Sequence, residues 1–266
     1  MAGGSDPDRW SDLRARLGSG AIMVGIGGLA VLAGGVWFQM LAVFATSVMV
    51  WELWTMIHRD RPTIGMLLAA LVASVLSGFL TVDRSYFLVF LLIAPLIGGF
   101  VARRERVTFA AFALAIQIAG WGLVVFRGDY GVTWLFWLIV VVVVTDIAGY
   151  FAGKTFGGPK FWPKVSPKKT WSGTVAGWLA AGVVGIVFIL LTPAGWWLVP
   201  VSMLLSFAGQ MGDIAESALK RRMKVKDSST LIPGHGGLFD RFDALLGASL
   251  FMLVAAVLFD LPRVAF

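Results

Sequence analysis

Long uncharged stretches constrain this chain more than any other feature of its sequence. Residues 21–57 contain a single charged side chain, that of Glu52. A transmembrane helix needs about 20 apolar residues to cross the hydrocarbon core of a bilayer. One helix over this run would be roughly 55 Å long at the usual helical rise, well beyond the core thickness of ~30 Å. We therefore predict two membrane spans here, with a hinge near Gly34 and Gly35.

The composition also points to a lipid environment. Apolar residues make up 58% of the 266 residues, 32 glycines add to them, and only 14% are charged, against about 25% in a soluble globular protein. A soluble fold of this size could not bury so much apolar surface, which excludes a soluble enzyme, a disordered tail and a fibrous repeat. Cysteine is absent, which excludes disulfides, thiolate zinc sites and cysteine nucleophiles.

The predicted fold is an all-α, polytopic membrane protein with about nine transmembrane helices. The expected spans are residues 21–35, 37–57, 64–82, 86–101, 107–126, 132–151, 174–192, 195–211 and 244–261. We divide the chain into N-terminal transmembrane helices, residues 1–130, and a C-terminal catalytic transmembrane region, residues 131–266. The second region holds two cytoplasmic loops, residues 152–173 and 212–243, which are the longest polar segments between the spans.

The basic residues give an independent test of this topology. With nine spans and a cytoplasmic N-terminus, 19 of the 22 lysines and arginines lie on the cytoplasmic side, and only Arg84, Arg127 and Arg263 lie outside. Merging the first two spans weakens this ratio to 16 against 6. The positive-inside rule therefore favours nine spans, with the N-terminus in the cytoplasm and the C-terminus outside. We expect an integral protein of the cell membrane, the inner membrane of a bacterium, with its active site on the cytoplasmic face.

The loop 212–243 carries residues suited to metal and phosphate chemistry. Asp213, Glu216, Ser217 and Lys220 are spaced i, i+3, i+4 and i+7, so they share one face if the helix of 195–211 continues inward. A carboxylate at the membrane boundary, with a lysine two turns further on, is suited to a metal ion beside a phosphate.

The end of the same loop adds further acids and a flexible segment. Asp240 and Asp243 open the last span, and oxygen ligands without histidine or cysteine clusters favour Mg²⁺ over zinc. The glycine-rich residues 233–237 offer backbone N–H groups to phosphate oxygens. His235 within them could donate a hydrogen bond to phosphate or transfer a proton.

Simpler interpretations exist for each of these residues. Glu216 and Lys220 could form a solvated helix pair worth about 0.2–0.5 kcal/mol, and Asp240 or Asp243 could simply cap the last helix. His235 could be a structural donor, and the basic run 220–226 could anchor to lipid headgroups. The density of charge favours the functional interpretation, because residues 212–243 hold five acids, six bases and a histidine in a chain otherwise poor in charge.

The order of these residues resembles a known family signature. Its elements are Ser217-x-x-Lys220-Arg221, then Lys226-Asp227, Pro233-Gly234-His235-Gly236-Gly237 and Asp240-Arg241-Phe242-Asp243, preceded by Gly212-Asp213-x-x-Glu216. This pattern is similar to that of phosphatidate cytidylyltransferases, also called CDP-diacylglycerol synthases. The run Ser166-Pro167-Lys168-Lys169-Thr170, interpreted as a rigid turn that presents two ammonium groups, extends the resemblance over about residues 140–261. The family usually has an acid where this chain has Ser172, so the chain departs from the family pattern at this position.

The resemblance implies a reaction of CTP with phosphatidate that gives CDP-diacylglycerol and pyrophosphate in phospholipid biosynthesis. The expected cofactor is Mg²⁺, alone or with a monovalent cation. Its leading ligands would be Asp213 and Asp240, with Asp227 and Asp243 as second choices. Phosphate groups would be held by Lys220, Arg221, Lys226 and Arg241, and the triphosphate also by Lys168 and Lys169. Ser217 and His235 would be supporting donors in the catalytic site.

Two other functions stay open at this level. One is a related CTP-dependent membrane transferase that acts on another lipid, and the other is a membrane transporter. Charges gathered at one membrane face, rather than inside the spans, argue against a transport path. Nucleic acid is not an expected partner, because no long basic arm exists and the net charge of +7 suits anionic lipid headgroups. Glycine-rich spans allow close packing within or between chains, so a homodimer is open. Glu52, His58 and Arg59 are expected to form a cluster at a helix end rather than part of the site.

Overall fold

The apolar runs of the sequence form helices that lie side by side. The computed structural model describes residues 7–81 and 85–258, so Arg84, Arg263 and the last residues of the span predicted over 244–261 lie outside the described residues. The helices are α1 (Pro7–Ala33), α2 (Gly35–Ile57), α3 (Pro62–Thr81), the 3₁₀ helix η1 (Ser85–Leu92), α4 (Ile93–Val101), α5 (Arg106–Tyr130), α6 (Val132–Phe156), α7 (Trp171–Leu191), α8 (Leu198–Arg222) and α9 (Phe239–Leu258).

The helical, polytopic membrane class predicted from the sequence is confirmed. Among the described residues, α2, α5, α6, α7, α8 and α9 are each long and apolar enough to cross a membrane, and three shorter apolar helices lie at Gly18–Ala33, Pro62–Gly78 and Val89–Val101. The count of nine spans and the orientation of the termini stay predictions. So does the division at residue 130.

The predicted hinge between the first two spans is present. Helix α1 ends at Ala33 and α2 begins at Gly35, and the backbone of Gly34 has a φ of 64°, which costs little only for glycine. The guanidinium of Arg127 on α5 donates to the carbonyls of Val31 and Leu32, and a Cβ at Gly34 would overlap it. Arg127 therefore satisfies the carbonyls that the end of α1 leaves without helical partners.

The span predicted over residues 86–101 is not one continuous α-helix. It begins as η1 and continues as α4. A 3₁₀ helix rises by about 2.0 Å per residue and an α-helix by about 1.5 Å. The two pieces in series therefore reach roughly 30 Å, which is about the thickness of the hydrocarbon core.

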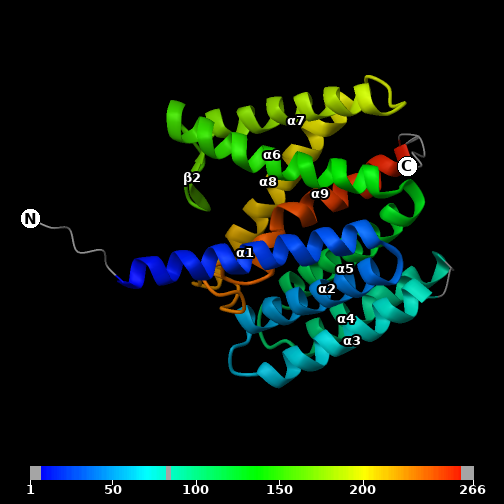
Figure 1. The fold of residues 1–266 in the computed structure, drawn as a ribbon. Helices are drawn as coiled ribbons and strands as arrows, with labels where there is room; N and C mark the ends of the chain where they lie inside the picture. Colours follow the sequence, from blue (N-terminus) through cyan, green and yellow to red (C-terminus); the bar gives the residue numbers. More distant parts are fainter. Residues whose placement is uncertain (1–6, 82–84, 259–266) are drawn as a thin grey trace, which may run out of the picture.

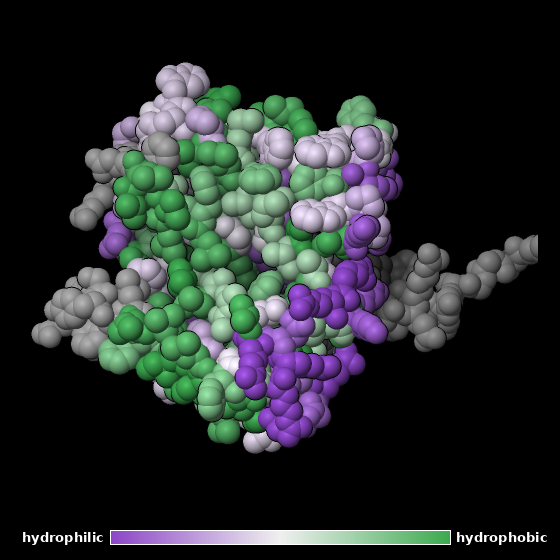
Figure 2. Space-filling view, turned by 180° about the vertical axis from the view of Figure 1, so that it is seen from behind, coloured by the Kyte–Doolittle hydropathy of each residue, from purple (hydrophilic) through white to green (hydrophobic). Residues whose placement is uncertain are grey.

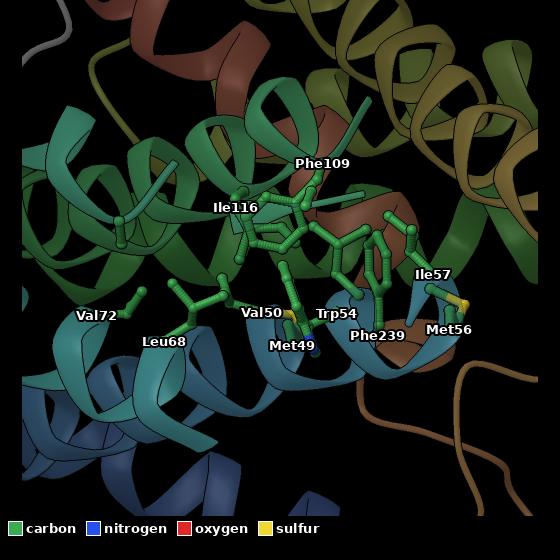
Figure 3. Close-up of a cluster of buried hydrophobic side chains, with 14 of the residues drawn as sticks. Met49, Val50, Trp54, Met56, Ile57, Leu68, Val72, Phe109, Ile116 and Phe239 are labelled. Atoms are coloured by element: carbon green, nitrogen blue, oxygen red, sulfur yellow. The ribbon is translucent and has the colours of Figure 1, made fainter. Parts of the chain in front are cut away.

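Two buried clusters of side chains hold the helices together. The first joins α2, α3, α4 and α5 around Trp54, whose ring meets that of Phe109 edge to face at 5.3 Å, and Phe239 of α9 completes it (Figure 3). The second joins α6, α7, α8 and α9. Hydrogen bonds between polar side chains also link the helices of the second group, as between Thr145 and Ser206 at 2.8 Å, an arrangement that suits helices packed in lipid.

One part of the fold departs from the all-α prediction. Residues 166–170, expected to form a rigid turn, are a β-strand, β2 (Ser166–Thr170), paired antiparallel with β1 (Lys160–Trp162). The strand forms because the backbone groups of β1 complete its hydrogen bonds. Figure 1 shows this hairpin and the loop between α8 and α9 at the same end of the molecule. We call this end the polar end.

The surface is divided in the same way. Figure 2 shows apolar side chains over most of one face of the molecule and hydrophilic side chains gathered towards one edge. Exposed apolar side chains include those of Leu29, Phe100, Leu179, Leu190 and Val257. An apolar side surface with a polar end is what a bundle immersed in lipid presents.

Candidate active site

Helix α8 carries the first acidic residues of the site. It continues without a break to Arg222, which confirms that Asp213, Ser217 and Lys220 share one helical face. The hydroxyl of Ser217 donates to Oδ1 of Asp213 at 3.1 Å, and the other carboxylate oxygen of Asp213 pairs with the ammonium of Lys169. Ser217 therefore donates to a carboxylate of the same helix, and its predicted role as a donor in catalysis stays a prediction.

The hairpin brings Lys169 to this carboxylate. Neighbouring residues of a strand point to opposite faces, so Lys169 turns to Asp213 while Lys168 is exposed. The strand ends at Thr170, whose Oγ1 accepts the N–H of Gly173 and caps α7. Ser172 donates to the carbonyl of Gly157 at 2.5 Å. Its hydroxyl therefore binds the backbone at the end of α6 and adds no charge to the site.

Asp243 on α9 and Asp146 on α6 complete a group of carboxylates around Lys169. Asp243 interacts electrostatically with Asp213 and Lys169, and Asp146 interacts with the same two residues. The helices can approach this closely because glycines stand where they cross. A Cβ at Gly212 would overlap the backbone carbonyl of Asp243.

This group of side chains carries oxygen atoms of the kind that hard cations bind. Asp146, Asp213 and Asp243 supply carboxylates, the ligands that Mg²⁺ prefers. Within the described residues, however, no three or more acidic, histidine or cysteine side chains lie close enough together to hold a metal ion. The magnesium site expected from the sequence therefore stays a prediction.

Asp240, predicted to be a leading metal ligand, is fully engaged by protein donors. Its Oδ1 accepts from the ammonium of Lys220 at 2.7 Å. Its Oδ2 accepts from the N–H and the hydroxyl of Ser228 and from the N–H of Gly237, each at 2.8 Å. The side chain is only 6% exposed. Asp240 is therefore placed to organise the loop between α8 and α9, and it lies beside the group around Asp213 rather than within it.

Lys220 forms ion pairs with two carboxylates rather than with the one that the sequence suggested. Its ammonium lies 2.5 Å from a carboxylate oxygen of Glu216 and 2.7 Å from Asp240, and Glu216 is only 1% exposed. The interpretation of Glu216 and Lys220 as a solvated helix pair is wrong, because neighbouring helices bury both groups. Lys220 links α8 to α9.

Residues 233–236 of the glycine-rich segment form one wall of a cavity of about 470 Å³. Its lining includes Lys226, Asp227, His235 and Arg241. His235 is held by α1, since its Nδ1 lies 2.8 Å from the hydroxyl of Ser19. Arg241 donates to the backbone carbonyl of His235 at 2.9 Å. Lys226, Asp227 and Arg221 are exposed, so their charges face solvent at the polar end.

Glu52 contributes to this region, although the sequence placed it in a helix-end cluster. It is fully buried and accepts hydrogen bonds from the loop between α8 and α9, including the N–H of Phe239 at 2.6 Å. The expectation is therefore wrong for Glu52. His58 does belong to the helix end, where its Nε2 accepts the N–H of Arg103 at 3.2 Å and burial lowers its pKa.

The sequence analysis assigned no role to Asp146 and placed Glu52 in a helix-end cluster. Both are carboxylates within apolar helical segments, and such residues usually face protein or water for a functional reason. That signal was present for both residues. What the sequence lacked was any indication of which distant segment each would meet.

The fold and the polar end define a class of protein: a polytopic membrane protein whose acidic and basic side chains gather at one end. Comparison with known sequences narrows this class. Residues 14–259 match the cytidylyltransferase family. The chain belongs to this family.

Relatives with assigned names agree with this result. A phosphatidate cytidylyltransferase of Brucella suis biovar 1 (strain 1330) is 34% identical over 265 residues, covering 96% of this chain and 97% of the relative. A phosphatidate cytidylyltransferase of Bacillus subtilis (strain 168) is 42% identical over 135 residues, half of each chain. One from Staphylococcus haemolyticus (strain JCSC1435) is 37% identical over 155 residues, covering 55% of this chain and 59% of the relative.

Proposed function

We propose that this protein transfers a cytidylyl group from CTP to phosphatidate and releases CDP-diacylglycerol and pyrophosphate. The observation that carries this proposal is the meeting of two family motifs at the polar end. Lys169 of the first motif pairs with Asp213, which opens the second, although the two residues come from different segments. The similarity to phosphatidate cytidylyltransferases over nearly the whole chain supports the same substrates.

The reaction needs little proton chemistry from the protein. A phosphate oxygen of phosphatidate attacks the α-phosphorus of CTP, a new P–O–P linkage forms, and the bond from the α-phosphorus to the bridging oxygen of the leaving pyrophosphate breaks. The nucleophile is already an anion, so no activated serine or general base is required. The protein must instead bring two polyanions together in a site where their repulsion is strong.

Cationic side chains at the polar end are suited to reduce that repulsion. Lys168, Arg221 and Lys226 are exposed there, and we assign them to the phosphate groups of the substrates. Lys169 reaches further into the group of carboxylates, where it would stabilise charge that develops on the α-phosphate and on pyrophosphate. Arg241 and His235 shape the loop that lines the cavity.

We propose that Mg²⁺, alone or with a monovalent cation, binds to Asp213 together with Asp243 and Asp146. A bound divalent cation polarises phosphoryl oxygens and offsets charge on the leaving group. Asp227 faces the neighbouring cavity and could contact a cation carried by the triphosphate. Asp240 is left with the role of holding Lys220 and Ser228, because protein donors already satisfy its carboxylate.

We place the polar end at the cytoplasmic face of the inner membrane. The substrates support this assignment, since CTP is a soluble nucleotide and the acyl chains of phosphatidate require hydrocarbon. The apolar side surface would lie in lipid with the phosphate of phosphatidate at headgroup depth, level with the basic side chains.

The test is an assay of the purified protein in detergent with phosphatidate and labelled CTP. We expect label in the lipid fraction with Mg²⁺ and none after chelation by EDTA, with recovery when Mg²⁺ is restored. Unchanged turnover in EDTA would contradict the metal proposal. Transfer from CTP to an isoprenoid lipid phosphate but not to phosphatidate would instead indicate a related transferase with another substrate.

A further inference from the structure

A buried carboxylate on α2 lies in direct contact with the loop between α8 and α9. Glu52 is 0% exposed. Within the described part of the chain, no lysine, arginine or histidine forms an ion pair with it. A carboxylate in an apolar helix is costly to bury unless hydrogen bonds satisfy it. The donors that satisfy Glu52 therefore identify the segment that its carboxylate positions.

All of these donors come from the loop. The hydroxyl of Ser229 and the N–H of Leu238 donate to Oε1 at 2.6 and 2.9 Å. The N–H of Phe239 and the hydroxyl of Ser228 donate to Oε2 at 2.6 and 3.3 Å. Each carboxylate oxygen of Glu52 therefore accepts two hydrogen bonds, so one buried side chain holds four donors of this segment.

The contacts fall at two separate points along the connection. Ser228 and Ser229 lie within the loop, after α8 has ended at Arg222, and Leu238 and Phe239 lie where the chain enters α9. Glu52 thus joins the middle of the loop to the start of α9. The residues between them include His235 and the glycine-rich wall of the cavity.

A second carboxylate holds the same loop from its other side. Asp240 accepts from Ser228 and from the N–H of Gly237. A Cβ at Gly237 would overlap both the hydroxyl of Ser228 and the carboxylate of Glu52. Only glycine therefore lets the backbone approach these two side chains so closely. Asp240 in turn holds Lys220, which connects the loop to the acidic face of α8.

We infer that Glu52 is a positioning residue for cytidylyl transfer: its carboxylate joins residues 228–229 of the loop to the start of α9 and so sets where the loop side chains stand relative to Asp213. This inference rests on the proposed function. It assigns a task in the reaction to the N-terminal helices, which otherwise carry none of the family motif.

The test compares Glu52→Gln and Glu52→Asp with a matched control. An amide keeps the size of the side chain but replaces one acceptor oxygen with a donor, so two loop donors lose their partner. We expect Glu52→Gln to lower kcat by about 100-fold, the loss expected for a displacement near 1 Å, and Glu52→Asp to recover part of it. Gln117→Met is the control, because Gln117 is equally buried on α5 and donates to the carbonyl of Ala113 in its own helix.

A second measurement does not depend on activity. Hydrogen exchange should show that the amides of Leu238 and Phe239 lose protection in Glu52→Gln and keep it in Gln117→Met. If Glu52→Gln does not fold, Ser229→Ala removes one of the contacts and should lower kcat several-fold with a smaller loss of protection.

The outcomes are distinct. Any one of three results would overturn the inference. The first is a kcat for Glu52→Gln within twofold of the unmodified protein, and the second is unchanged protection of the two amides. The third is an equal loss of kcat in Gln117→Met. If the unmodified protein makes no CDP-diacylglycerol, the proposed function fails, while hydrogen exchange still reports whether Glu52 holds the loop.

Discussion

Asp213 and Asp240 show how differently two carboxylates of one motif can be used. Asp213 is 27% exposed and shares its oxygens between Lys169 and Ser217. Asp240 is almost fully buried, and four protein donors meet it. The first can exchange a protein contact for a substrate or a metal ion, whereas the second holds the fold together.

This difference predicts that the two substitutions affect stability to different extents. Asp213→Asn should lower turnover by about 100-fold or more, as expected for loss of a charge that stabilises the transition state. Its stability should change by less than about 1 kcal/mol, because the pair with Lys169 is partly exposed. Asp240→Asn should lose activity together with about 3 kcal/mol of stability, because it leaves Lys220 and two backbone donors poorly matched.

Thermal unfolding in detergent and the CTP assay, made on the same preparations, check this prediction. Glu105→Gln is a suitable control, since Glu105 forms an ion pair with the exposed Arg222 at the surface. Equal loss of stability in Asp213→Asn and Asp240→Asn would contradict the distinction between the two residues.

At the scale of elements, the site depends on how closely α8 and α9 cross. Gly212 and Gly247 stand at the crossing, and a Cβ at either would overlap the backbone of the opposite helix. Asp213 and Asp243 lie next to this contact on the two helices. The distance between their carboxylates is therefore set by residues that have no functional group.

We predict that Gly212→Ala separates the two helices and lowers activity at least 10-fold, with a loss of about 1–3 kcal/mol from overpacking. Gly28→Ala on α1, where a Cβ would meet nothing within 4 Å, should leave activity unchanged. The CTP assay and thermal unfolding of both variants measure these effects. Normal activity in Gly212→Ala would show that the close crossing is not needed.

Element boundaries were predictable only where the local sequence determines them. The hinge at Gly34 and the inward continuation of α8 followed from glycine and from helical spacing. The strand at residues 166–170 did not, because its hydrogen bonds come from β1 and the proline-containing run resembles a turn when considered alone. The pattern of apolar residues over the fourth predicted span, 86–101, did not indicate that it begins as a 3₁₀ helix.

At the scale of the whole molecule, the polar end requires that the hairpin and the loop between α8 and α9 face the same compartment. The chain has no cysteine, so single cysteines can report this directly. Lys164 between β1 and β2 is exposed, as is Asp129 near the end of α5, just before α6 begins. One crossing by α6 separates them.

We predict that Lys164→Cys is labelled from the cytoplasmic side and Asp129→Cys from the outside by a thiol reagent that does not cross membranes. Intact cells and inverted vesicles give the two readings, and the unmodified protein serves as the blank. Labelling of both positions from one side would rule out a spanning α6, and labelling of Lys164→Cys from outside would reverse the predicted orientation.

The sequence by itself determined the class of the protein and the residues of its motifs. Hydropathy and helical spacing are local properties, so the membrane helices, the hinge at Gly34 and the shared face of Asp213 and Lys220 followed from neighbouring residues alone. Only the tertiary structure decided which partner each charge has. Glu52 and Phe239 are 187 positions apart, and their hydrogen bond exists because whole helices pack against each other. Packing, rather than residue type, therefore left Asp213 open to a ligand and committed Asp240 and Glu52 to the loop.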